Sequence, residues 1–142
     1  MKHAGTKEKK IKEKKMKKLS KMLVVLTLVC SMFLTACGAP KTIEEYYNQP
    51  VIRQALDAQL EQLAEQNSTI FSKVEMAVTE NDVVYNYYYV GDVEVDPDLL
   101  TMTDAQFDQA KQAIEGDCKI LPNTITYNYY YNDGTLIKSL SK

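Results

Sequence analysis

The sequence predicts an α+β fold, a four-stranded antiparallel sheet with two helices on one face, in the order helix-strand-strand-helix-strand-strand. Three observations carry this prediction. Apolar residues recur at helical spacing in some segments, alternate with polar residues in others, and turn signals separate the segments. All of these elements fall within residues 42–142, which we expect to form a single domain. The pattern leaves the order of the strands across the sheet open.

In the first half, Thr42 and Glu45 have the spacing of a capping box, in which each residue satisfies the other's end of the helix, and Asn48-Gln49-Pro50 interrupts this helix. Pro50 suits the first position of a second helix, expected over 50–66, whose apolar spacing is set by Val51, Leu56, Leu60 and Leu63. Period-two alternation then predicts a strand over 70–78. A turn at 79–82 and a strand over 83–90 complete a hairpin.

The second half repeats this order. An acidic loop covers 91–98, and both Asp96-Pro97 and the pair Thr103 and Gln106 are helix-start signals. Helical spacing, carried by Leu99, Phe107, Ala110 and Ile114, continues to Gly116. We expect a third strand over 124–131, a hairpin turn at Asp133-Gly134, and a last strand over 135–140.

The string Tyr-Asn-Tyr-Tyr-Tyr occurs twice, at 85–89 and at 127–131, which indicates two equivalent αββ units. Duplication and the same selection on two equivalent strands both explain it. Because an unpaired buried amide is costly, the faces that hold Asn86 and Asn128 should be the wetter ones. Tyr88 and Tyr130 then stand on the open face beside these two asparagines, and four other tyrosines pack beneath the helices: Tyr85, Tyr87, Tyr127 and Tyr129.

Tyrosine and asparagine together on a rigid sheet are typical of recognition surfaces. The four open-face residues are therefore our candidate ligand-binding residues, for an unknown protein, peptide or glycan: Asn86, Tyr88, Asn128 and Tyr130. The plainer interpretation is that tyrosine simply suits half-buried strands. A second function, from a different class, is a structural or regulatory adaptor of a membrane or envelope protein complex that uses its edge strands or its acidic loop.

The beginning of the chain indicates export. Ten of the seventeen basic residues precede Cys37, so residues 1–36 carry a net charge of +8, whereas residues 37–142 carry −10. Lysines precede an apolar run over 22–34, which is shorter than the roughly 20 residues of a membrane-spanning helix and is typical of a signal peptide over 1–36. Met16 offers a more ordinary signal start than Met1.

Leu34-Thr35-Ala36-Cys37 resembles the lipobox of bacterial lipoproteins, which implies that Cys37 becomes a lipidated N-terminus. The alternative is an ordinary cleaved signal with an incidental cysteine. Two acyl chains anchor a protein stably, so we expect residues 37–41 to tether the domain at the outer face of the cytoplasmic membrane. The four residues after Cys37, 38–41, reach roughly 13 Å when extended, at about 3.3 Å per residue.

Several chemistries are disfavoured. The one histidine is His3, within residues 1–36, so the domain has no imidazole for a catalytic pair or for zinc, and we expect neither an enzyme nor a metal or cofactor. An acidic domain disfavours nucleic acid. Alternating acidic residues over 92–98 could offer oxygens to calcium, but a solvated loop is the simpler interpretation. Cys118 fits a buried, inert thiol, with an intermolecular disulfide or a reactive thiol as the alternative.

The chain resembles a family of small lipoproteins of Gram-positive, largely clostridial, bacteria known as domain of unknown function 4854. The matching segments are Thr42-Ile43-Glu44-Glu45-Tyr46 with Pro50 after it, Val83-Val84-Tyr85, and 131–137. The consecutive tyrosines depart from the family pattern. The resemblance implies a location and a domain extent, and it implies no activity.

Overall fold

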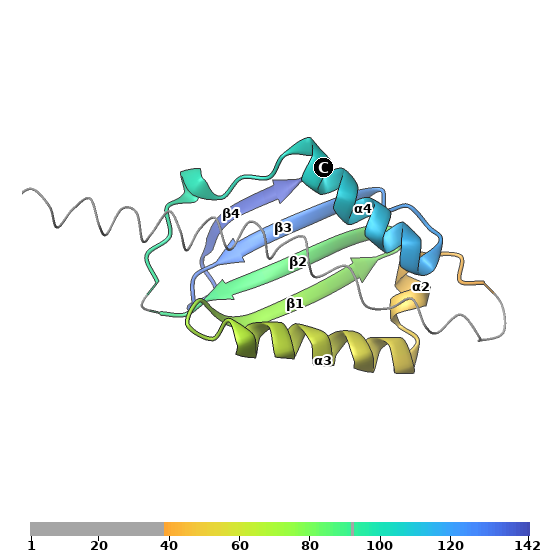
Figure 1. Ribbon diagram of the computed structural model, residues 1–142, viewed down its shortest axis with the longest axis horizontal. Coiled ribbons are helices and arrows are strands. Elements are labelled where there is room, and N and C mark those ends of the chain that lie inside the picture. The colour runs from red at the N-terminus through yellow and green to blue at the C-terminus, as the bar shows by residue number, and fades with distance from the viewer. Residues whose placement is uncertain (1–38, 92) are drawn as a thin grey trace, which may run out of the picture.

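A four-stranded sheet with helices packed on it forms the protein and confirms the α+β class (Figure 1). The computed structural model describes residues 39–91 and 93–142. The predicted signal peptide, the lipobox-like sequence with Cys37, and Asp92 lie outside the described residues. Every element that the sequence predicts in the domain has a counterpart, although several boundaries and one strand pairing differ.

Two helices precede the sheet, α2 (Ile43–Tyr47) and α3 (Pro50–Gln66). Thr42 Oγ1 accepts from Glu45 N at 3.0 Å, but the Glu45 carboxylate accepts from Lys41 N, so the expected capping box is only half formed. Pro50 begins α3 as predicted. The prediction that Val51 lies on the buried face is wrong, since Val51 is 61% exposed; Ile52 is buried instead, because it shares the i, i+4 row of Leu56 and Leu60.

Strands β1 (Phe71–Thr79) and β2 (Asp82–Tyr89) form the predicted antiparallel hairpin, with Glu80 at a φ of 54° in its turn. An irregularity in register lies between Phe71 and Lys73. The strict alternation predicted from residue 70 is therefore wrong at this end, because a bulge changes which side chains face the core. Phe71 is buried together with Val74 and Met76.

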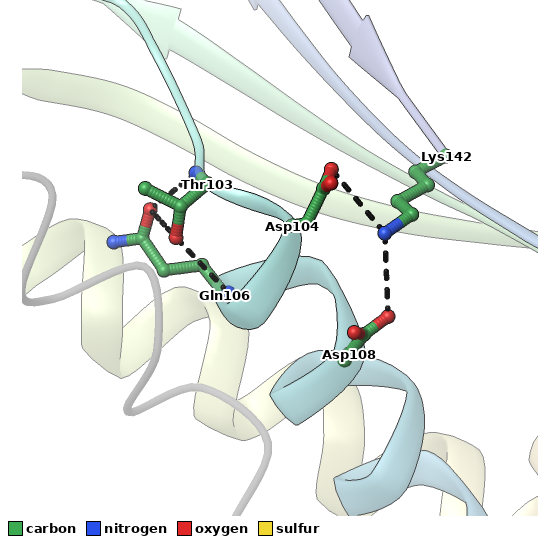
Figure 2. Close-up of polar contacts among 5 residues, drawn as sticks. All are labelled: Thr103, Asp104, Gln106, Asp108 and Lys142. Atoms are coloured by element: carbon green, nitrogen blue, oxygen red, sulfur yellow. Dashed lines mark hydrogen bonds and ion pairs between the residues drawn. The ribbon is translucent and has the colours of Figure 1, made fainter.

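A crossover connection carries the short helix η2 (Pro97–Leu99) and the long helix α4 (Asp104–Cys118). The predicted capping box is present: Thr103 N donates to Gln106 Oε1 at 2.8 Å, and Gln106 N donates to Thr103 Oγ1 at 3.3 Å (Figure 2). The helix end predicted at Gly116 is too early, because the left-handed residue that ends α4 is Lys119, with a φ of 63°.

One face prediction for this connection is also wrong. Leu99, predicted on the buried helix face, lies in η2 and is 50% exposed, and Leu100 is buried in its place. In the first turns of α4, Asp104 and Asp108 form ion pairs with Lys142 at the end of the chain. Lys142 Nζ lies 3.2 Å from Asp104 Oδ1 and 3.6 Å from Asp108 Oδ1, which joins the end of the last strand to this helix (Figure 2).

The sheet order is β1-β2-β3-β4, with β3 (Thr124–Tyr130) and β4 (Leu136–Ser141) joined through the predicted Asp133-Gly134 turn. β3 and β4 are antiparallel, but β2 and β3 are parallel, so the prediction of four antiparallel strands is wrong at the central pair. The reason is the connection: α4 returns the chain to the end where β2 begins, so Thr124 lies beside Asp82.

The parallel pairing places the two Tyr-Asn-Tyr-Tyr-Tyr strings side by side in register, Tyr85 beside Tyr127 and Tyr88 beside Tyr130. The four tyrosines expected beneath the helices are each 3% exposed or less, as is Tyr89, and Phe107 of α4 packs on the Tyr127 ring at 5.9 Å. These side chains form the central part of the core.

Candidate binding face

The candidate site is the open face of the sheet, which we define as the face opposite the tyrosines that pack beneath the helices. The structure brings all four predicted residues together here: Asn86 pairs with Asn128, and Tyr88 pairs with Tyr130. Each side chain is half-buried. Their alignment follows from the parallel pairing of the two identical strings, which places like residues directly beside one another.

Two rows of hydrogen bonds cross this face. Asn128 Nδ2 donates to Asn86 Oδ1 at 3.1 Å, and Ser139 Oγ of β4 donates to Asn128 Oδ1 at 2.6 Å. In the neighbouring row, the hydroxyls of Thr126 and Ser141 lie 2.8 Å apart. Because each amide is held by its neighbours, these side chains lose little further freedom when a partner binds.

An aromatic pair lies next to the amide row. The rings of Tyr88 and Tyr130 stack with centroids 4.9 Å apart and an interplanar angle of 15°. Lys73 Nζ of β1 lies 5.6 Å from the centroid of Tyr88, on the side away from β3. The Tyr88 ring thus has a cation on one face and a ring on the other, and it offers a ligand its edge and its hydroxyl.

Charge is concentrated at the β1 side of the open face. Lys73 forms an ion pair with Glu75, and Glu75 lies beside Asn86 in the register. Partial burial, and then the nearby Glu75 carboxylate, raise the pKa of the Tyr88 hydroxyl. This hydroxyl is therefore protonated at neutral pH and can donate a hydrogen bond.

Lys73, Glu75 and Ser139 belong to the face but are not among the residues that the sequence predicts for the site. Alternation in β1 already separates Lys73 and Glu75 from Val74 and Met76. Nothing in the sequence, however, says that Lys73 is the neighbour of Tyr88 or that Ser139 is the neighbour of Asn128. That knowledge requires the strand order and the register.

The other candidate features take part in local structure. Asp96 Oδ1 accepts from Asp98 N at 3.0 Å and so caps η2. Within residues 39–91 and 93–142, no group of three or more metal-ligating side chains comes together. Cys118 is buried, its Sγ donates to Ile114 O at 3.1 Å, and burial raises the pKa of its thiol, which agrees with the interpretation as a packed core residue.

Comparison with known family models, curated proteins and solved structures gives no match to this chain. Membership in the lipoprotein family that the sequence resembles thus stays a prediction. Among the described residues, no helix is long and apolar enough to cross a membrane.

Proposed function

We propose that the chain is a lipid-anchored surface lipoprotein whose folded part is a non-catalytic binding module. Cys37 holds it at the outer face of the cytoplasmic membrane, and the open face contacts a protein or peptide. The in-register pairs Tyr88–Tyr130 and Asn86–Asn128 carry this proposal, because they present aromatic edges, hydroxyls and fixed amides on one face. Rigid tyrosines with neighbouring amides are typical of protein-recognition surfaces.

The arrangement of the rings favours a protein or peptide over a glycan. A sugar that stacks on an aromatic side chain needs a free ring face, whereas Lys73 and Tyr130 occupy both faces of Tyr88. On the far side of Tyr130, Leu136 of β4 is the paired residue. A partner surface can instead pack against ring edges and bond to the two hydroxyls and the amide row.

The anchor rests on the lipobox-like sequence before Cys37, and it has its own test. In a Gram-positive host fed a radiolabelled fatty acid, the Cys37→Ala chain should lose the label and leave the membrane fraction. Cys30→Ala is the matched control, because Cys30 lies inside the expected signal peptide and should not affect labelling. Equal labelling of both variants would contradict the anchor.

The binding face is tested by capturing partners from solubilised envelope and cell-wall material with the immobilised full-length chain. The Tyr88→Ser/Tyr130→Ser variant should lose a partner that the parent chain keeps through a high-salt wash. Tyr131→Ser removes a more exposed tyrosine outside the open-face pair and should have no effect. If the Tyr88→Ser/Tyr130→Ser variant still captures the partner, and the high-salt wash removes it from both chains, the result would favour an acidic adaptor over this function.

A further inference from the structure

A groove at the edge of the sheet adjoins the open face but is lined by neither Tyr88 nor Tyr130. It has a volume of about 600 Å³, within the usual range for ligand sites, and lies between α3 and β1. Figure 1 shows α3 running along the β1 side of the sheet. Arg53, Asp57, Leu60 and Glu61 line the groove from the helix, residues 72–77 line it from β1, and Asn86 of β2 lines it from the open face.

The floor of this groove is the edge of β1 that has no strand of the described residues beside it, where an added strand would replace the contact of Arg53 with the Met76 carbonyl. In an antiparallel pair, alternate residues direct their backbone N–H and C=O groups away from the partner strand. Arg53 Nη2 donates to Met76 O at 3.4 Å, which shows that Met76 points outward, and the alternation then directs Val74 and Val78 outward as well. An edge of this kind is a template for a further strand.

Charge on the edge specifies what such a strand should carry. Lys73 and Glu75 are two residues apart on the open face, where they form an ion pair with each other; Lys73 is largely exposed and Glu75 is half-buried. A strand that pairs antiparallel to β1 is stabilised when it carries an acidic residue opposite Lys73 and a basic residue opposite Glu75. The residue between these two would point toward the α3 side, where Leu60 offers an apolar contact.

We propose that the free edge of β1 binds an extended peptide, antiparallel to β1, that carries a basic residue followed two positions later by an acidic one. Backbone bonds to the edge supply affinity, and the paired charges set direction and register. The occupant is a peptide segment and not a second whole chain, because α3 packs along β1 and a second chain paired edge to edge would bring its own α3 to the same place.

The sequence of β1 itself has the required pattern, because Lys73 and Glu75 are complementary to each other in an antiparallel register centred on Val74. A fluorescein-labelled peptide of residues 71–79 is therefore a suitable probe. A second peptide, with the lysine and the glutamate exchanged, has the same composition but places like charges opposite one another. Fluorescence anisotropy of each peptide is measured against the full chain in detergent micelles.

The first peptide should bind about thirtyfold more tightly than the exchanged peptide, which corresponds to about 2 kcal/mol, because two exposed charge pairs change from attraction to repulsion. The Lys73→Glu/Glu75→Lys chain should reverse this preference. Binding should slow hydrogen exchange at the Val74 and Val78 amides. The Tyr88→Ser/Tyr130→Ser chain should still bind the first peptide, so this test is independent of the proposed function of the open face.

Three results would overturn the proposal. The first is equal binding of the two peptides or no binding of either. The second is a preference that does not reverse in the charge-exchanged chain. The third is concentration-dependent dimerisation of the parent chain that the charge exchange in one copy abolishes, which would make a second copy the occupant.

Discussion

Three buried tyrosines have hydroxyls without a hydrogen-bond partner within the described part of the chain: Tyr87, Tyr89 and Tyr127. Each residue is 1% exposed, and burial raises the pKa of each hydroxyl, so all three stay protonated and uncharged. A buried hydroxyl that has lost its water without gaining a partner costs about 1–3 kcal/mol. Their rings stabilise the core by packing, whereas their oxygens oppose that stabilisation.

Replacing Tyr87 by Phe should therefore raise the free energy of unfolding by about 1 kcal/mol, because the ring stays and the unpaired oxygen is removed. Urea unfolding of the full chain measures this change. Tyr85→Phe is the matched control: Tyr85 lies on the same face of β2, but its hydroxyl is not among the buried oxygens that lack a partner, so the substitution should not stabilise. A destabilised Tyr87→Phe chain would show that ordered water satisfies the hydroxyl.

At the scale of elements, the two long helices begin by different means. α3 begins at a proline without a side-chain cap, whereas α4 begins with a full capping box. We expect Thr103→Ala to destabilise the chain by about 1 kcal/mol, because the amide of Gln106 loses its acceptor. Thr101→Ala is the control, since Thr101 is exposed just before the helix. Equal thermal midpoints for the two variants would contradict a stabilising role of the cap.

Local patterns in the sequence predict the local part of this fold. The α4 capping box, the Asp133-Gly134 turn and the inward tyrosines all depend on residues close together in the chain, and the structure confirms each. The parallel pairing of β2 with β3 brings together residues that are 42 positions apart in the sequence. It depends on the path that α4 takes between the two strands, and no local pattern encodes that path. The bulge near Phe71 likewise arises from pairing with β2.

The same division applies to the candidate site. Alternation by itself places Asn86 and Tyr88 on one face of their strand, and Asn128 and Tyr130 on the equivalent face of theirs. The contact between the two pairs, and the addition of Lys73 and Ser139, require the sheet order and the register. The composition of the face is thus predictable from the sequence, whereas its geometry, on which the proposed preference for a protein over a glycan rests, is not.

At the scale of the whole molecule, the net charge of −2 divides into +8 on residues 1–36 and −10 on residues 37–142, so the folded part is strongly acidic. Residues 37–142 carry seven basic and seventeen acidic side chains. Ion pairs in the described residues include Arg53–Asp57, Lys73–Glu75 and Lys142–Asp104, all at exposed or half-exposed positions. Exposed pairs contribute little, so repulsion among the remaining carboxylates should be the larger electrostatic effect on folding.

Added salt should therefore raise the free energy of unfolding of the domain within residues 37–142. Raising sodium chloride from about 0.01 M to about 0.15 M shortens the Debye length from about 30 Å to about 8 Å, which screens repulsion between distant carboxylates more than attraction within a close pair. We expect the thermal midpoint to rise by about 4 °C, which corresponds to roughly 1 kcal/mol for a domain of this size. The rise should be smaller in a chain with Glu61→Gln and Glu65→Gln, two carboxylates on the exposed side of α3. A thermal midpoint that falls with salt would mean that attraction within the ion pairs outweighs repulsion among the carboxylates. The ion pairs of Lys142 with α4 would then be the first to test by substitution.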